Sequence, residues 1–168
     1  MSFLSSIKGS DATPEKVSLE GYIDMLSLVE RLHRLLLDVI KDEFERLGVL
    51  DINAVQALLL FNMSDNEVTA GELKSRGYYQ GSNVSYNLKK LVEAGYMHHQ
   101  RCDMDRRAVR VKLTERGARI RKVVSDLFAR HADGLYREGR LDGSTVTEMN
   151  LAMQRIERYW SDQIRYIY

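Results

Sequence analysis

The chain reads Cys102-Asp-Met-Asp-Arg-Arg-Ala-Val-Arg-Val-Lys-Leu-Thr114 in its second half, where a charged loop runs into a strand. From Ala108 to Leu113 the side chains alternate, with Val109, Val111 and Leu113 on one face and Arg110 and Lys112 on the other. This period of two is typical of a strand with one buried and one solvated face. A strand with a cationic outer face, preceded by Arg106 and Arg107, is well suited to lie along a phosphate backbone.

Basic residues gather around this stretch, although the net charge of the whole chain is only +1. Between Lys74 and Lys122 there are 13 Lys and Arg and 4 Asp and Glu, whereas the remaining positions hold 12 basic and 20 acidic residues. Such a polarised chain indicates that one segment faces a polyanion. A solvated basic surface that neighbouring acidic helices neutralise explains the charge alone equally well.

The composition bounds the class of protein. A length of 168 residues with 44% hydrophobic residues fits one domain with helical extensions and a real core. No run of 18 apolar residues is present and the start lacks the profile of a signal peptide, so we expect neither a membrane span nor secretion. The single cysteine, Cys102, excludes an internal disulfide and suits the reducing cytoplasm, where we expect the protein.

A long helix is predicted from Ser18 to Leu47, after a polar tail over residues 1–17 that we expect to be flexible. Two adjacent apolar rows run along this helix: Tyr22, Leu26, Val29, His33, Leu36, Ile40, Phe44 and Leu47, and beside them Leu28, Leu32, Leu35 and Val39. A helix that is apolar over so wide an arc cannot bury itself against one thin domain. We therefore expect it to pack against a second chain.

Short helices follow, each with its own boundary signals. Gly48 ends the first helix, and Asp51 is the predicted cap of a helix over Ile52 to Asn62. Thr69-Ala-Gly-Glu72 is a capping box that starts a helix ending near Gly77. Another helix is predicted from Ser82 to Ala94, and Gly95 stops it.

Two strands and two long helices complete the chain. Tyr96 to Arg101 and Ala108 to Leu113 are predicted to form a hairpin, Thr114 to cap a helix extending to about Arg137, and Ser144 to Arg165 to form the last helix. The apolar face of that last helix is interpreted as packing: Val146, Met149, Met153, Ile156, Trp160 and Ile164. The order predicts a mainly α fold, α+β only through its hairpin. It is a winged helix-turn-helix with long helices on both sides.

The segment Asp105 to Gly117 resembles the wing of the MarR family of bacterial winged-helix transcription regulators. That wing commonly reads Asp-x-Arg, a small residue and an alternating strand that ends in Leu-Thr-x-x-Gly, and every landmark is present here. Upstream, the family's recognition helix and its exit resemble Val84-Ser85, Leu88, Leu91, Gly95 and Tyr96-Met97. The resemblance covers about Gly48 to Arg121. The chain departs from the family pattern at two places: Tyr86 stands where members often carry Arg, and the loop 78–81 is unusually aromatic. Both departures bear on which DNA sequence the protein recognises, and not on its mode of binding.

The resemblance implies a homodimer on double-stranded DNA that represses or activates transcription. Residues 18–47 and 115–168 then form the helical dimerisation region, and residues 48–114 form the winged helix-turn-helix domain. A small aromatic or amphipathic effector is implied too, and His33 is the candidate residue of its pocket. On an apolar row, however, a hydrogen-bonded core histidine is favoured over a ligand-binding one for His33.

DNA-contacting residues are expected on two elements. On the helix from Ser82 the face opposite the apolar row carries Ser82, Asn83, Ser85, Tyr86, Lys89 and Lys90, of which Asn83 can bond adenine and the lysines phosphates. In the wing, Asp105 has the spacing to pair with Arg107 and hold the loop, while Arg106, Arg110 and Lys112 follow the backbone. By resemblance, Arg107 enters the minor groove.

Few other residues of the chain suggest a functional site. Cys102 lies near His98, His99 and Arg101, which could make it an oxidation sensor, but a bystander cysteine is favoured because the chain has no second cysteine. His98 and His99 point to opposite faces of a strand, so we expect no shared metal, and no cofactor is implied. No catalytic constellation appears, which argues against an enzyme. The alternative to DNA is a winged-helix module that binds an acidic protein partner.

Overall fold

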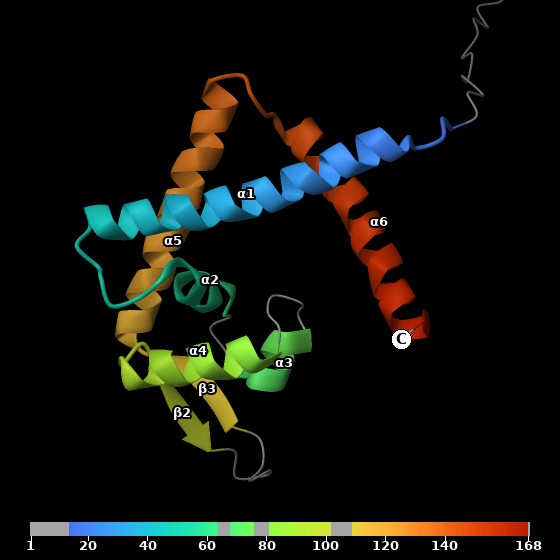
Figure 1. The fold of residues 1–168 in the computed structure, drawn as a ribbon. Coiled ribbons are helices and arrows are strands. Elements are labelled where there is room, and N and C mark those ends of the chain that lie inside the picture. The colour runs from blue at the N-terminus through green and yellow to red at the C-terminus, as the bar shows by residue number, and fades with distance from the viewer. Residues whose placement is uncertain (1–13, 64–67, 76–80, 102–108, 168) are drawn as a thin grey trace, which may run out of the picture. The chain divides into compact units, whose positions relative to one another are not determined.

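The computed structural model describes residues 14–63, 68–75, 81–101 and 109–167, and Figure 1 labels its helices together with β2 and β3. In chain order these are α1 (Leu19–Arg46), α2 (Ala54–Asn62), β1 (Val68–Thr69), α3 (Ala70–Ser75), α4 (Gly81–Glu93), β2 (Met97–Arg101), β3 (Val109–Leu113), α5 (Glu115–Arg137) and α6 (Gly143–Ile167). The predicted fold class, mainly helical with a small antiparallel sheet, is confirmed. The chain divides into two units, residues 1–38 and residues 39–168.

The predicted cap of α2 is wrong by two residues. Asn53, not Asp51, is the N-cap: its Oδ1 accepts from the backbone N–H of Gln56 at 2.8 Å, and Gln56 Oε1 accepts from the Asn53 N–H at 3.2 Å. The Asp51 carboxylate instead accepts hydrogen bonds from Tyr96 and Arg116. A charged guanidinium and a phenol are stronger donors to a carboxylate than an amide, so they take Asp51 away from the helix end.

Other predicted boundaries are confirmed. Thr69 and Glu72 form the capping box at the start of α3, with bonds of 3.1 and 2.9 Å. Thr114 Oγ1 accepts from the Gly117 N–H at 3.2 Å and caps α5. Gly95 has a φ of +78°, a left-handed conformation that favours glycine and turns the chain from α4 into β2.

The sheet has the order β1-β3-β2 and is antiparallel throughout. The predicted hairpin is confirmed, and its register pairs Met97 with Leu113 and Arg101 with Val109. β1 was not predicted, because two residues carry no readable alternation. Its Val68 pairs with Val111, and both side chains are buried.

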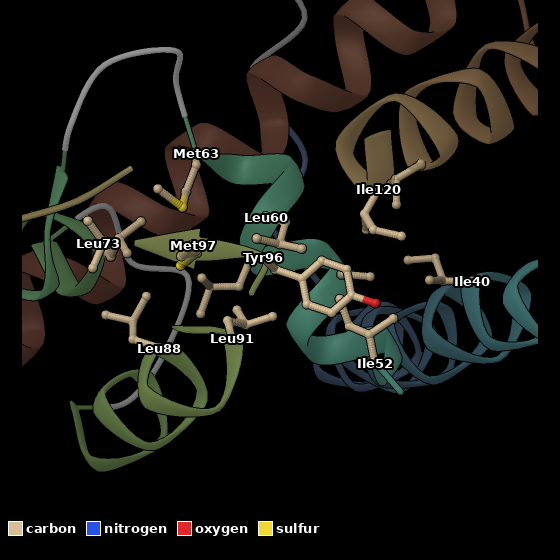
Figure 2. Close-up of a cluster of buried hydrophobic side chains, with 14 of the residues drawn as sticks. Ile40, Ile52, Leu60, Met63, Leu73, Leu88, Leu91, Tyr96, Met97 and Ile120 are labelled. Carbon is tan, nitrogen blue, oxygen red and sulfur yellow. The ribbon is translucent and has the colours of Figure 1, made fainter. Parts of the chain in front are cut away.

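One hydrophobic core holds the second unit together, and Figure 2 shows part of it. Its members come from α2, α3, α4, the sheet, the first half of α5, the end of α1 and the segments between these elements. Those fully buried include Ile40, Leu59, Leu60, Leu73, Val84, Leu91, Tyr96, Met97, Val111 and Val124. No α6 residue belongs to the core formed by the described residues.

The end of α1 is tied to α5 by a buried carboxylate. Glu43 is 8% exposed, and its Oε1 accepts from Arg130 Nη2 at 2.6 Å and from Arg46 Nη2 at 2.8 Å. Hydrogen bonding from Arg46 first, and from Arg130, outweighs the desolvation of the group and lowers the pKa of Glu43 to about 2. The bond to Arg130 joins segments 87 residues apart in the sequence.

Apolar side chains remain exposed on α1 and on α6. Among the described residues of the first unit, 14–38, none is buried. Its exposed apolar side chains include Leu19, Ile23, Leu28, Val29, Leu32 and Leu35, and those of α6 are Val146, Met149, Leu151, Met153, Tyr159, Trp160, Ile164 and Tyr166. His33 is exposed as well, so the interpretation as a core histidine is wrong for the single chain. No described helix is both long enough and apolar enough to span a membrane.

Candidate nucleic-acid interface

Helix α4 separates a buried face from an exposed one, as its sequence predicts. Val84, Leu88 and Leu91 are no more than 6% exposed and pack into the core. Tyr86 is 61% exposed. The other described side chains of the outer face are also exposed: Asn83, Ser85, Lys89 and Lys90. Of the predicted α4 residues, the side chain of Ser82 alone lies outside the part that is described. The structure thus brings five of the six onto one accessible helix surface.

The two lysines of this surface are held near one carboxylate. Glu93 lies 3.9 Å from Lys89 Nζ and 3.3 Å from Lys90 Nζ, and the Lys90 ammonium also sits 5.9 Å from the centre of the Tyr86 ring. Solvent-exposed pairs of this kind contribute little free energy. Phosphate oxygens can therefore take over both ammonium groups from Glu93.

A short hydrogen-bond relay connects α4 to the start of α2. Gln56 Nε2 donates to Asn87 Oδ1 at 3.2 Å, and Asn87 Nδ2 donates to the backbone carbonyl of Asn83 at 2.9 Å. Asn87 is 8% exposed, which is unusual for a carboxamide. Sequence reasoning missed Gln56 and Asn87. The spacing Asn53-x-x-Gln56, a capping-box pattern, was the available signal for the first.

The exit of α4 is clamped to α5 through Tyr96. Its hydroxyl donates to Asp51 Oδ1 at 2.6 Å, and Arg116 donates to the other oxygen of Asp51. The Arg116 guanidinium also lies 4.3 Å from the centre of the Tyr96 ring and donates to the Ala94 carbonyl at 2.8 Å. Burial, followed by the hydrogen bond to Asp51, raises the pKa of Tyr96 to about 12. The hydrogen bond from Tyr96, ahead of the charge of Arg116, lowers the pKa of Asp51.

Gly117 lets α5 begin directly against this exit. A Cβ atom at this position would lie 2.2 Å from the carbonyl oxygen of Tyr96, which also accepts the Thr114 N–H at 3.1 Å. No side chain fits at that distance. The Leu-Thr-x-x-Gly pattern at residues 113–117 is therefore explained by a backbone contact between α5 and Tyr96, the residue before β2.

The described part of the wing carries cations on its outer face. The strand register places His98 beside Lys112, and Lys112 is exposed. Arg110 is only half-buried, not fully exposed as predicted, and its Nε is enclosed without a hydrogen-bond partner in the part of the chain that is described. Cys102, Asp105, Arg106 and Arg107 lie outside the described residues.

Known proteins with a winged helix are similar to this chain in sequence and in fold. The family model described as a winged helix DNA-binding domain matches residues 52–117, which run from just before α2 to the first turn of α5. The exopolysaccharide II synthesis transcriptional activator ExpG of Rhizobium meliloti is 30% identical over 149 residues, 89% of this chain and 76% of that protein. The chain belongs to the MarR family.

Solved structures share the fold of this MarR-family protein. A MarR transcriptional regulator from Methanosarcina mazei Go1 aligns with a TM-score of 0.67 at 21% identity, over 83% of this chain and 98% of that one. Staphylococcus aureus MarR, solved in complex with salicylate and kanamycin, aligns with a TM-score of 0.69 at 16% identity, over 86% and 95%.

This MarR-family protein is a DNA-binding transcription regulator and not an enzyme. Family membership therefore favours DNA over an acidic protein as the partner of the basic surface. Within the described residues, no group of three or more His, Cys, Asp or Glu side chains could hold a metal ion.

Proposed function

We propose that this protein binds a pseudo-palindromic operator as a homodimer, with α4 of each subunit in a major groove. The observation that carries the proposal is the two-sided character of α4, whose outer face presents a carboxamide, hydroxyls and ammonium groups while its inner face is fixed in the core. A major groove about 12 Å wide accepts one such helix. Asn83 would read a base edge, and Lys89 and Lys90 would bond phosphates.

The exposed apolar faces of α1 and α6 support dimerisation. Each carries large side chains that are about half-exposed in the single chain, including Leu32 at 54% and Met153 at 44%. Apolar patches of this extent are covered in stable proteins, and a second copy of the chain offers the same faces. A two-fold dimer then places its α4 helices on half-sites about 34–36 Å apart, or a multiple of one turn.

The wing extends the contact beside each half-site. In this proposal Arg107 enters the minor groove, Asp105 holds the loop through Arg107, and Arg106, Arg110 and Lys112 follow the phosphates. The exposed Lys112 on β3 supports this, because it already faces away from the core. The half-buried Arg110 supports a weaker role for that residue.

A small-molecule effector is the proposed signal. The Staphylococcus aureus protein of the same fold is in complex with salicylate and kanamycin, and salicylate is a small aromatic acid. An aromatic or amphipathic molecule that binds near His33 would change DNA affinity by favouring one dimer geometry over another.

DNA binding tests the proposal directly. Operator DNA selected from a random pool is titrated by fluorescence anisotropy at two salt concentrations, with wild type, Arg107→Ala and Arg140→Ala. Arg107→Ala is expected to weaken binding by about 1–3 kcal/mol. Arg140→Ala removes the same charge from the turn between α5 and α6, and is expected to bind like wild type.

Equal DNA affinity of Arg107→Ala and Arg140→Ala would contradict the minor-groove role of Arg107. Failure of the wild type to enrich any DNA sequence, together with weak binding even at low salt, would contradict the proposed mode of binding as a whole.

A further inference from the structure

We propose that Gln56 is a positioning residue for sequence-specific DNA binding: through Asn87 it fixes the rotation of α4 about its own axis. This inference rests on the proposed function, in which α4 reads bases. Gln56 belongs to α2, and its hydrogen bond to α4 is made to Asn87, on the buried side of that helix.

The direction of every bond in the relay is fixed. Gln56 Oε1 is taken by the Asn53 N–H at 3.2 Å, so the side chain must present its NH₂ group to Asn87 Oδ1, also at 3.2 Å. Asn87 Nδ2 is in turn taken by the Asn83 carbonyl at 2.9 Å. Neither carboxamide can turn over without setting two donors or two acceptors against each other. The relay therefore has a single low-energy arrangement.

The relay adds a directional constraint to the packing of α4. The inner face of α4 is held by Val84, Leu88 and Leu91, and apolar contact is not directional. Asn87 lies on the same buried side and is 8% exposed. Its hydrogen bond to Gln56 restricts both the distance and the angle between the two side chains. Its last acceptor is the backbone of Asn83, a residue of the outer face.

Rotation of α4 matters more for bases than for phosphates. Contacts from lysine and arginine to the backbone are electrostatic and tolerate small displacements, so they dominate non-specific binding. Bidentate bonds to base edges require each donor–acceptor distance to stay within a few tenths of an ångström of its ideal value. They also require a donor–hydrogen–acceptor angle above about 120°. Loss of the relay should therefore reduce the preference for operator over random DNA and leave non-specific affinity in place.

Gln56→Glu separates the two roles of this side chain. Glu at this helix position still accepts from the Asn53 N–H, and its charge is favourable near a helix N-terminus, so the cap of α2 is kept. The group facing Asn87 Oδ1 changes from a donor to an acceptor. Asn53→Asp is the matched control: it makes the same change of charge in the same cap, on an exposed residue whose side chain accepts from the Gln56 N–H and makes no bond to the described side chains of α4.

The experiment measures Kd for operator and for scrambled DNA, together with Tm, for the full-length protein. Gln56→Glu is expected to lower the ratio of the two affinities about 10-fold, with non-specific Kd within about 2-fold and Tm within about 2 °C of wild type. Asn53→Asp is expected to leave the ratio unchanged. An equal ratio in the two variants, or a ratio that falls only together with Tm, overturns the proposal.

Asn87→Ala removes the other partner of the bond between Gln56 and Asn87. It therefore tests the same proposal, also if Gln56→Glu does not fold. It should lower the ratio about 5–10-fold, and Gln56→Glu added to it should change the ratio no further. Full additivity of the two substitutions, or an unchanged ratio in Asn87→Ala, overturns the proposal. A wild type without operator preference contradicts the proposed function instead, so the two failures are distinguishable.

Discussion

At the scale of single residues, the Tyr96 carbonyl oxygen requires a glycine at position 117, because a Cβ atom there would lie 2.2 Å from this oxygen. Gly117→Ala is therefore expected to lower the free energy of unfolding by about 2–3 kcal/mol, because the start of α5 must move away from the backbone of Tyr96. Urea unfolding measures the change.

Gly134→Ala is the control in the same helix. Among the described residues, nothing beyond the neighbouring backbone of α5 lies within 4 Å of a Cβ atom there, so the substitution should stabilise the protein by about 0.5–1 kcal/mol. If both variants unfold at the midpoint of wild type, the contact at Gly117 does not constrain the protein.

Residues that bond within a few positions along the chain could be predicted from the sequence, and residues that bond across the fold could not. Thr69 and Thr114 cap the helices that directly follow them, so their patterns were readable. Asp51 looked like a local cap of the same kind, but its partners lie 45 and 65 residues away. Gln56 and Asn87 are 31 residues apart, and no spacing rule joins them.

At the scale of elements, Glu43 joins α1 to α5, and its bonds predict a dependence on pH. Its pKa in the folded protein, about 2, is below the ordinary value of 4.5. The carboxylate therefore contributes stability that is fully present above about pH 4.5 and is lost as the pH falls toward about 2. Unfolding free energies at pH 6 and pH 3 should show this loss in wild type.

Glu43→Gln should remove that part of the pH dependence and lower stability at pH 6 by about 1–2 kcal/mol, because two arginines lose a charged acceptor. Glu45→Gln on the same helix changes an exposed carboxylate 3.6 Å from Lys41 and should have little effect. If Glu43→Gln keeps the acid sensitivity of wild type, Glu43 is not its source.

The elements themselves were largely predictable. The alternation in residues 108–113 predicted β3, and the spacing of Val84, Leu88 and Leu91 predicted the buried face of α4. β1 escaped prediction because Val68 and Thr69 form a strand only through the register of β3. The wing residues Asp105, Arg106 and Arg107 stay a prediction, as they lie outside the described part of the chain.

At the scale of the whole molecule, the apolar arc of α1 predicts the oligomeric state. Leu32 lies within this arc and is 54% exposed, so Leu32→Glu should leave the single chain folded and prevent dimerisation. Light scattering after size exclusion should give half the mass of wild type. Operator affinity should fall at least about 100-fold, because the second half-site is no longer held in reach.

Ser27→Glu places the same side chain on the same helix. At 100° per residue it lies opposite the apolar arc, and Ser27 is exposed. This variant should remain dimeric and bind the operator normally. Equal masses for Leu32→Glu and wild type would mean that α1 is not part of the interface.

Helix α5 is continuous over 23 residues, with Gly117 pressed on the exit of α4 near one end and Arg130 bonded to α1 toward the other. A helix of this length spans about 35 Å and bends little, so it acts as a lever. Gly117 and Arg130 lie about 20 Å apart along this helix. A tilt of about 10° would therefore move one through about 3 Å relative to the other, which exceeds the tolerance of a hydrogen bond to a base. In the proposed complex with DNA, a small change in angle at the Arg130 end of α5 is therefore enough to move α4 away from the bases that it contacts.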